Sequence, residues 1–139
     1  MKIGKKILVM GLPGSGKTTL AKMLAKELNA VWLNADEIRK KNNDWDFSEE
    51  GRNRQAERMF NLSEEFINQG KQVVADFICP TARTRNKFKP DKIIWMDTIS
   101  KGRFDDTNRM FEKPEIYDFR ITVKDAINES KKIIEKIKE

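Results

Sequence analysis

An eight-residue motif near the start, Gly-Leu-Pro-Gly-Ser-Gly-Lys-Thr at residues 11–18, most constrains what this chain can fold into. It matches the pattern G-x-x-x-x-G-K-[ST] in full. The apolar run at residues 7–10 predicts a buried strand before the motif, and the apolar positions of residues 17–28 recur at helical spacing after it. A strand, a glycine-rich loop and a helix in this order are typical of the opening of a parallel α/β fold.

Each residue type in this loop has a separate physical task. Glycines let successive backbone N–H groups turn toward phosphates, and the start of the following helix adds partial positive charge. Lys17 is expected to reach the terminal phosphates, which makes it a predicted catalytic residue, and Thr18 is expected to bind Mg²⁺. The sequence therefore predicts that ATP is bound by Gly11, Leu12, Pro13, Gly14, Ser15, Gly16, Lys17, Thr18 and Thr19.

Strands and helices are predicted to alternate along the rest of the chain. The further strands are expected at 31–33, 72–77, 92–96 and 118–123, and the further helices after Asn34, from Ser48 to about Asn68, within 80–89 and over 124–138. This order predicts an α/β fold, a three-layer sandwich with a central, mostly parallel sheet of the P-loop NTPase kind.

The length of the chain and its last helix complete the predicted fold. With 139 residues the chain has little room for a second core, so residues 1–139 are expected to form one domain. In the last helix the residues expected to cover the sheet are Ala126, Ile127, Ile134 and Ile137.

Composition excludes several kinds of chemistry. The chain has no histidine and a single cysteine, Cys79, which argues against zinc chemistry, Ser-His-Asp hydrolysis and an internal disulfide. A net charge of +6 suits an anionic partner, although much of the excess lies in lysines near the termini. Since no apolar run approaches the length of a membrane span or a signal segment, we expect no membrane partner and a cytoplasmic location.

Three further residues are candidates for the chemistry of phosphoryl transfer. Asp36 and Asp76 follow the second and third predicted strands, at the edge where ligands of open α/β sheets bind. Either carboxylate is suited to deprotonate an acceptor or to hold Mg²⁺. Arg52 falls at the centre of the apolar face of its helix, where a guanidinium must reach solvent or meet an anion.

The order of these motifs resembles that of the adenylylsulfate kinases, which use ATP to phosphorylate the 3′-hydroxyl of adenosine 5′-phosphosulfate. After the P-loop the family has Leu-Asp-Gly-Asp-Asn-x-Arg, then Gly-Phe-Ser followed by Arg and Asn, then Phe-Ile-Ser-Pro. The matching segments here are residues 33–39, residues 46–48 with Arg52 and Gln55, and residues 77–80. Residues 111–114, Phe-Glu-Lys-Pro, are similar to a later Tyr-Glu-x-Pro element of the family.

The resemblance implies a kinase that uses ATP and Mg²⁺ and takes a small sulfonucleotide as its acceptor. It implies Asp36 as catalytic base or Mg²⁺ partner, and Thr18 and Asp36 as the metal ligands. It also implies arginines on the acidic groups of the acceptor and Phe47 stacked on its adenine. The implied acceptor-binding residues are Asp36, Arg39, Phe47, Arg52, Gln55 and Ile78. A homodimer is left open by the sequence.

The chain departs from the family pattern at several positions. Asn34 stands in place of the first aspartate, Gln55 in place of an asparagine, and Cys79 in place of a serine that can carry phosphate. The family's basic lid after the fourth strand is missing. Arg103 and Arg109 lie in the shortened segment, and solvated loop charge is the favoured interpretation of both.

Two alternatives remain beside the sulfonucleotide kinase. One is a P-loop kinase for another small hydroxyl compound or for a nucleic-acid 5′-end, which would bind with steep salt dependence. The few basic residues in the predicted cleft favour a small acceptor over nucleic acid. The other is a nucleotide-binding module without catalysis, because lids exclude water and supply positive charge.

Overall fold

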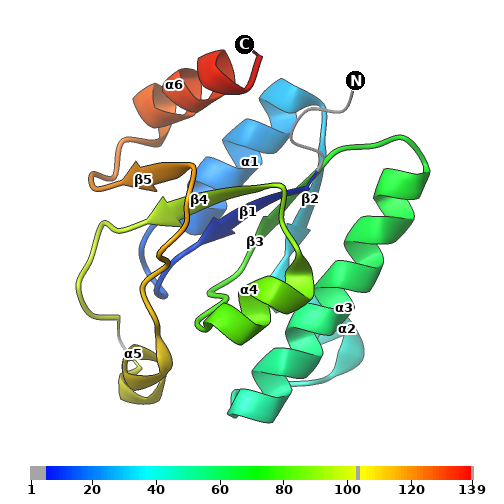
Figure 1. The fold of residues 1–139 in the computed structure, drawn as a ribbon, viewed down its shortest axis with the longest axis vertical. Coiled ribbons are helices and arrows are strands. Elements are labelled where there is room, and N and C mark those ends of the chain that lie inside the picture. The colour runs from blue at the N-terminus through cyan, green and yellow to red at the C-terminus, as the bar shows by residue number, and fades with distance from the viewer. Residues whose placement is uncertain (1–5, 103, 139) are drawn as a thin grey trace.

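A single parallel sheet organises the computed structural model, which describes residues 6–102 and 104–138. Its strand order is β2-β3-β1-β4-β5, and each neighbouring pair is parallel. The strands are β1 (Lys6–Met10), β2 (Val31–Asn34), β3 (Val73–Asp76), β4 (Lys92–Met96) and β5 (Phe119–Ile121). Because all of them run the same way, their carboxyl ends meet at one edge of the sheet (Figure 1).

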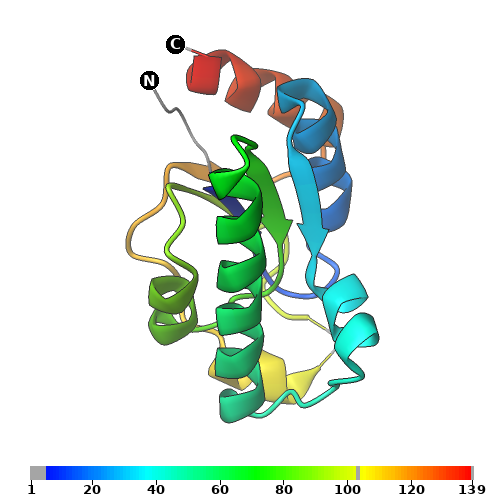
Figure 2. The same cartoon turned by 90° about the vertical axis from the view of Figure 1, so that its right-hand side faces the viewer.

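Helices cover both faces of this sheet. They are α1 (Lys17–Leu28), α2 (Ala35–Asn42), α3 (Glu49–Asn68), α4 (Ala82–Phe88), α5 (Asp105–Met110) and α6 (Ala126–Lys138). The pair α1 and α6 packs together on one face, whereas α3 and α4 pack together on the other, as the two perpendicular views show (Figures 1 and 2). The predicted three-layer sandwich with a parallel sheet is confirmed.

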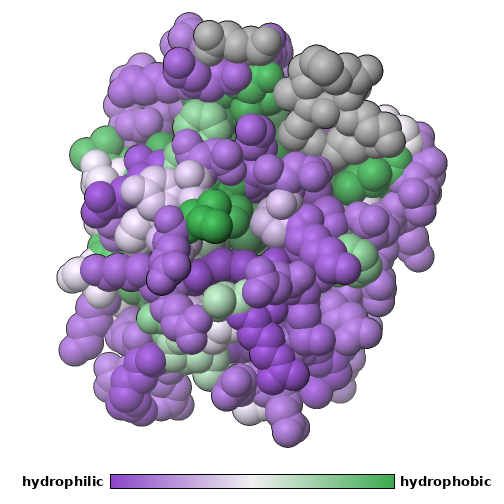
Figure 3. All heavy atoms as spheres, in the orientation of Figure 1, coloured by the Kyte–Doolittle hydropathy of each residue, from purple (hydrophilic) through white to green (hydrophobic). Residues whose placement is uncertain are grey.

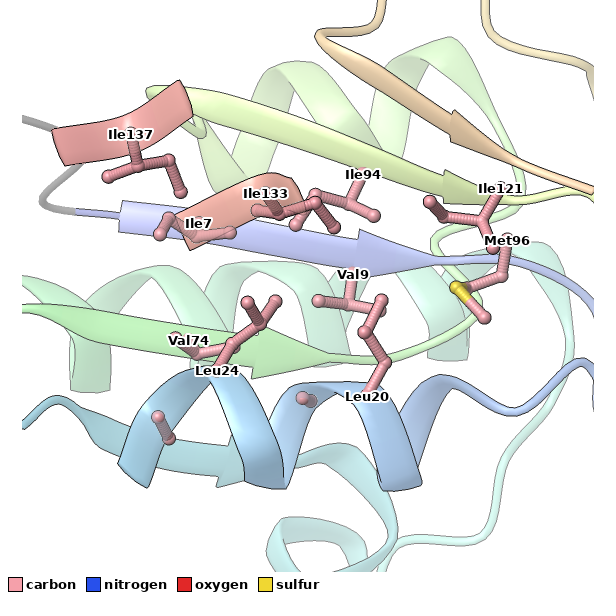
Figure 4. Close-up of a cluster of buried hydrophobic side chains, with 12 residues drawn as sticks. Ile7, Val9, Leu20, Leu24, Val74, Ile94, Met96, Ile121, Ile133 and Ile137 are labelled. Carbon is pink, nitrogen blue, oxygen red and sulfur yellow. The ribbon is translucent and has the colours of Figure 1, made fainter. Parts of the chain in front are cut away.

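The core lies in two layers, one on each face of the sheet. Alternate residues of β1 divide between them: Ile7 and Val9 pack toward α1 and α6, and Leu8 and Met10 pack toward α3 and α4. Figure 4 shows the first layer, in which Leu20 and Leu24 of α1 meet the strands. A strand that is covered on both faces has a continuous apolar sequence. This is why the segment before the glycine loop could be predicted as a buried strand.

The last helix covers the sheet with three of the four residues predicted for it, since Ile137 is buried and Ala126 and Ile134 pack against the same core cluster. Ser130, Ile133 and Ile137 are buried, whereas Ile127 is 59% exposed. The prediction for Ile127 was wrong because the buried residues lie three or four apart, and Ile127 falls about 100° away from that stripe on the helix. Ile133 packs among the strands instead (Figure 4).

The face shown in Figure 3 is mainly hydrophilic, with hydrophobic residues in small separate areas. Within residues 6–102 and 104–138, no helix is both long and apolar enough to cross a membrane.

Candidate active site

The glycine-rich loop joins the end of β1 to the start of α1. Gly11 and Gly16 have φ values of 153° and 98°, and Gly16 forms the cap at the start of α1. The Lys17 Nζ donates a hydrogen bond to the carbonyl oxygen of Leu12 at 3.1 Å. A helix start with an adjacent lysine is a site for phosphate, so the loop has the geometry that the motif predicts.

Gly11 has no room for a side chain, which gives a first prediction. A Cβ atom at this position would lie 2.7 Å from the Met96 carbonyl oxygen and 2.9 Å from the Ser15 Oγ. We expect Gly11→Ala to lower the free energy of unfolding by about 1–3 kcal/mol, as overpacking does, and to weaken ATP binding at least about tenfold. Denaturant unfolding and calorimetric titration with ATP measure the two effects.

Gly70 is the matched control for this substitution. It also has a positive φ, 85°, but no atom lies within 4 Å of the place where its Cβ would be. Gly70→Ala should therefore cost only the backbone strain, about 1 kcal/mol, and leave ATP binding unchanged. Equal effects of the two substitutions on ATP binding would contradict the assigned role of Gly11.

A buried carboxylate lies beside the loop at the end of β3. Asp76 is 3% exposed, and its Oδ1 accepts a hydrogen bond from the Thr18 Oγ1 at 3.3 Å. The Trp32 Nε1 donates to its Oδ2 at 2.6 Å, and the Asn34 Nδ2 donates to its Oδ1 at 3.1 Å. Burial raises the pKa of Asp76 above its usual value, although these donors act in the opposite direction.

Asp36 lies on the neighbouring helix but does not join this group. It is exposed on the first turn of α2, after the cap residue Asn34, whose side chain accepts a hydrogen bond from the Glu37 N at 3.1 Å. Within the described residues, Thr18 is hydrogen-bonded to Asp76 and not to Asp36. The direct partner of Thr18 is thus Asp76, and the assignment of Thr18 and Asp36 as metal ligands stays a prediction.

Two buried arginines and an exposed aromatic ring form a second group near the same edge of the sheet. Arg39 and Arg52 are 4% and 6% exposed, and their guanidinium carbons lie 4.4 Å and 5.4 Å from the Phe47 ring centroid. Neither arginine is among the ion pairs of the described residues. Arg39 donates hydrogen bonds to backbone carbonyls, and Arg52 donates to the Phe47 carbonyl and to the Thr107 Oγ1. Burial lowers the pKa of both groups.

This arrangement confirms that Arg52 faces inward from α3, as its place on the helix predicted. Burial lowers the pKa of Arg39, and three carboxylates, Asp44, Asp36 and Asp46, act on the Arg39 charge in the opposite direction, whereas the pKa of Arg52 is lowered by burial and by the Arg39 charge. Phe47 is 47% exposed and lies between the arginines and solvent-facing Trp45, with the two ring centroids 6.4 Å apart. The group is suited to bind an anion that also carries a planar ring.

The loop of residues 43–48, which carries Phe47, is held by charges that sequence reasoning missed. The Arg54 Nε and the Arg58 Nη2 donate to the Asp44 Oδ2 at 2.8 Å and 3.0 Å, and the Arg54 Nη2 donates to Asp46 at 3.1 Å. These arginines hold the pKa of Asp44 below its usual value. Hydrogen bonds from Ser48 and Arg54 lower the pKa of Asp46.

The remaining predicted acceptor residues differ in how they are placed. Gln55 is 2% exposed, its Nε2 donates to the Ala35 carbonyl at 3.0 Å, and its Oε1 accepts from the Arg58 Nη1 at 2.7 Å. Both ends of its amide are thus used within the protein, and they connect α3 to the start of α2. Ile78 follows β3 and is half-buried.

The shortened segment after β4 connects the glycine loop to the arginine pair. The Thr98 Oγ1 donates to the Ser15 carbonyl at 2.7 Å, and a Cβ on Gly102 would lie 3.2 Å from Pro13. Further along, the Thr107 Oγ1 of α5 accepts from the Arg52 Nη2 at 2.7 Å. Residues 98–107 therefore span from the predicted ATP loop to the predicted acceptor residues.

Arg109, the arginine of this segment that the structure describes, is directed to solvent and not into the site. Arg109 pairs with Asp106 at 2.6 Å while its side chain is 73% exposed, which agrees with solvated loop charge. Arg103, the other arginine considered, lies outside the described residues.

Cys79 is buried, and residues far along the chain form hydrogen bonds with its neighbourhood. The thiol is 1% exposed, and burial raises the pKa of Cys79 to about 12. The Arg85 Nε donates to the Cys79 carbonyl at 3.1 Å, and the Arg85 Nη2 donates to the Glu112 carbonyl. The Glu112 N donates to the Pro80 carbonyl at 2.6 Å, so the two family-like segments at 77–80 and 111–114 are in direct contact.

Comparison with known proteins finds a family model and curated relatives that match this chain. The family model described as "Adenylylsulphate kinase" matches residues 3–95, which is more than half of the chain. The adenylyl-sulfate kinase of Bacillus velezensis is 31% identical over 102 residues, which cover 69% of this chain and 48% of that protein. The chain thus spans about half the length of the curated relatives it matches.

Solved structures show the same fold over the whole chain. An APS kinase of Mycobacterium tuberculosis, solved with AMPPNP and APS, superposes with a TM-score of 0.79 at 19% identity and covers 100% of both chains. A shikimate kinase of Acinetobacter baumannii, solved with shikimate, superposes with a TM-score of 0.62 at 21% identity over 94% of this chain and 91% of that chain. At these identities the likeness is one of fold.

Proposed function

Because the chain belongs to the adenylylsulfate kinase family, we propose that it transfers the γ-phosphoryl group of ATP to the 3′-hydroxyl of adenosine 5′-phosphosulfate. The observation that carries the proposal is the pair of buried guanidinium groups, Arg39 and Arg52, beside the exposed ring of Phe47. This acceptor offers what the group requires, a doubly acidic phosphosulfate joined to a flat purine. An anion bound there would also compensate the buried charge.

The proposed reaction divides the site into two halves. Residues 11–19 cradle the triphosphate, and Lys17 leaves the Leu12 carbonyl to neutralise charge on the terminal phosphates. Mg²⁺ would supply further charge stabilisation at these phosphates, and hydroxyl and carboxylate oxygens near the loop are suited to hold it. Asp36 takes the proton from the acceptor hydroxyl as general base. Gln55 acts as a positioning residue, because its amide fixes the start of the helix that carries Asp36.

The shortened segment offers a reason why the missing lid need not abolish transfer. It already connects Ser15 with Arg52 through Thr98 and Thr107, so the two halves are linked without a long mobile lid. Among the residues of the segment that the structure describes, Arg109 is solvated and paired with Asp106, so it does not replace the positive charge of a lid. We therefore expect a slower kinase rather than an inactive one.

Arg52→Ala is expected to act on the acceptor and not on ATP. Loss of a charged hydrogen-bonding group costs about 1.5–3 kcal/mol, which corresponds to a rise of about 10- to 150-fold in KM for adenosine 5′-phosphosulfate. The KM for ATP should change less than about twofold. Arg52→Lys should not restore binding, because an ammonium lacks the planar fork of the guanidinium. Steady-state kinetics with each substrate varied in turn measures these values.

Arg109→Ala is the control for this experiment, since it removes an arginine whose side chain is solvated on α5. It should leave both KM values unchanged. A rise in KM for ATP with Arg52→Ala, or equal effects of the two substitutions on the acceptor, would overturn the assignment of Arg52.

The activity itself is tested with a panel of acceptors. Coupled ADP release is followed with ATP and Mg²⁺ alone and with adenosine 5′-phosphosulfate, AMP, shikimate or an oligonucleotide with a free 5′-hydroxyl. We expect turnover with the sulfonucleotide and background release with the others. Equal or faster turnover with another acceptor would replace the proposed substrate, and ATP binding without any turnover would indicate a binding module.

Two further properties belong to the same proposal. A hexameric APS kinase from Thiobacillus denitrificans shares the fold, with a TM-score of 0.72 over 96% of this chain. We propose that this chain also forms a homo-oligomer, with a dimer as the smallest form. A cytoplasmic location is proposed as well, because the reaction consumes ATP.

A further inference from the structure

Trp45 is an exposed aromatic residue that the proposed reaction does not use. It is 51% exposed, and its ring centroid lies 6.4 Å from that of Phe47, with 45° between the two ring planes. Within residues 6–102 and 104–138, Phe47 is the ring that it contacts, and its Nε1 takes part in no hydrogen bond. The indole therefore has both a flat surface and a donor available for a ligand.

The other two tryptophans are used within the fold. The Trp32 Nε1 donates to the Asp76 Oδ2 at 2.6 Å, and Trp95 is 6% exposed with the Tyr117 ring 5.6 Å away. A buried indole usually finds a partner for its N–H group in this way. Of the three tryptophans, all of which the structure describes, Trp45 is the one whose ring is left for a ligand.

The backbone on both sides of Trp45 is held in place. The Arg39 Nη1 donates to the carbonyl oxygens of Asp44 and Asp46, at 3.1 Å and 3.0 Å. The Asp46 N donates to the Asp44 Oδ1 at 3.1 Å, and the Asp44 carboxylate also accepts hydrogen bonds from two arginines of α3. A ring on a backbone fixed in this way binds with little further loss of loop entropy, because the loop is ordered before the ligand arrives.

The same loop packs closely on α3 at Gly51. A Cβ atom on Gly51 would lie 2.1 Å from the Asp46 carbonyl oxygen. This is the oxygen that accepts the hydrogen bond from Arg39. Because Gly51 has no side chain, the loop that carries Trp45 can lie against α3, directly beside the arginine group.

The arginines and the two rings follow the order of the parts of a nucleotide. The guanidinium carbons of Arg39 and Arg52 lie 4.4 Å and 5.4 Å from the Phe47 ring centroid, and the Trp45 ring lies 6.4 Å from it. An acidic group at the arginines would thus be separated from a base at Trp45 by Phe47, much as a ribose separates phosphate from base. An aromatic side chain is a suitable surface for a base, because every base has a π-face on which to stack.

We propose that Trp45 is a specificity-determining residue of the acceptor site, on whose indole the purine of the acceptor stacks while Arg39 and Arg52 bind its acidic groups. The inference rests on the proposed function and deepens it, because the resemblance to the family does not imply this residue. Phe47 then lies between the two parts of the ligand. An acceptor without a flat base gains nothing from Trp45, so this residue favours purine nucleotides over small hydroxyl compounds.

Two ligands that differ in the base test this proposal. AMP and ribose 5-phosphate share a phosphate and a sugar, and their binding to the full chain is measured by calorimetry with saturating AMPPNP and Mg²⁺, so that the glycine loop is occupied. We expect wild type to prefer AMP, and Trp45→Ala to raise the Kd for AMP about 5- to 150-fold, the range for one base stacked on an aromatic side chain. The Kd for ribose 5-phosphate should stay within about twofold. Equal losses for both ligands, no loss for AMP, or a wild type without preference for AMP would overturn the proposal.

Tryptophan fluorescence tests the position of the base independently of affinity. Adding AMP to wild type under the same conditions should change the emission of the exposed indole. Trp45→Phe keeps an aromatic ring and should still bind AMP, but it should lack most of this change, because Trp32 and Trp95 have partners within the fold. A change in Trp45→Phe as large as that in wild type would contradict stacking on Trp45.

Tyr117→Ala is the matched control. Tyr117 is also an exposed aromatic residue, at 41%, but its ring packs on Trp95 and not on the arginine group. This substitution should leave the Kd for AMP unchanged. A loss of AMP affinity equal to that of Trp45→Ala would show that the effect is not specific to the loop of residues 43–48.

This inference and the proposed function fail in distinguishable ways. A wild type that binds AMP with a fluorescence change absent from Trp45→Phe, but does not turn over the sulfonucleotide, would contradict the proposed function alone. A protein that turns over the sulfonucleotide with an unchanged KM in Trp45→Ala would contradict the role of Trp45 alone.

Discussion

Lys17→Ala is expected to lower kcat by about 10²- to 10³-fold, the loss seen when one preorganised group that stabilises transition-state charge is removed. The Lys17 Nζ contacts the Leu12 carbonyl at 3.1 Å, so the ammonium is held at the loop before ATP arrives. Since this contact is local, the fold should persist and the thermal unfolding midpoint should change little. Stopped-flow or coupled ADP release measures kcat, and thermal unfolding checks the fold.

Lys26→Ala provides the matched control on the same helix. Lys26 is exposed in the last turn of α1, at the end away from the glycine loop. This substitution should leave kcat unchanged. A loss of kcat with Lys26→Ala as large as that with Lys17→Ala would show that the charge of α1, and not a contact with phosphate, controls the rate.

Asp36→Asn is expected to lower kcat by about 10²- to 10⁴-fold, the range for a general acid–base group. The substitution preserves size and removes the ability to accept the proton of the acceptor hydroxyl. Because Asp36 is proposed to act on the acceptor hydroxyl, the affinity for nucleotide with Mg²⁺ should remain close to that of wild type. Single-turnover kinetics separates the chemical step from binding.

Glu37→Gln is the control for Asp36, because both acids lie in the first turn of α2 and are exposed. It removes one charge from the same helix start without touching the proposed base. We expect kcat within about twofold of wild type. Full activity of Asp36→Asn would exclude Asp36 as the base and direct attention to Asp76.

Patterns along the chain were sufficient to predict the fold. The bounds of β1 and α1 agree with the apolar run and the helical spacing around the glycine loop. Ser48 begins α3 as predicted, since its side chain accepts a hydrogen bond from the Gly51 N. These features are local and depend on residues close in sequence. The wrong prediction for Ile127 has a physical reason, because the sequence of a short amphipathic helix is compatible with more than one apolar stripe.

The site was less predictable, because its contacts join distant residues. The bond between Thr18 and Asp76 spans 58 positions, and that between Arg52 and Thr107 spans 55. The pairing of Arg54 and Arg58 with Asp44 depends on how the 43–48 loop folds back on α3. The sequence did offer Asp76 beside Asp36 as a candidate base or Mg²⁺ ligand, because it ends a strand near the glycine loop, but it did not show which of the two contacts Thr18.

The central claim is tested most directly by following the γ-phosphoryl group. ATP labelled in that group is incubated with the chain, Mg²⁺ and adenosine 5′-phosphosulfate, and the labelled product is separated and the position of its phosphate determined. We predict label on the 3′-oxygen of the sulfonucleotide, with the yield reduced in parallel by Lys17→Ala and Asp36→Asn. Tight ATP binding with no label on the sulfonucleotide, or label at another position, would contradict it.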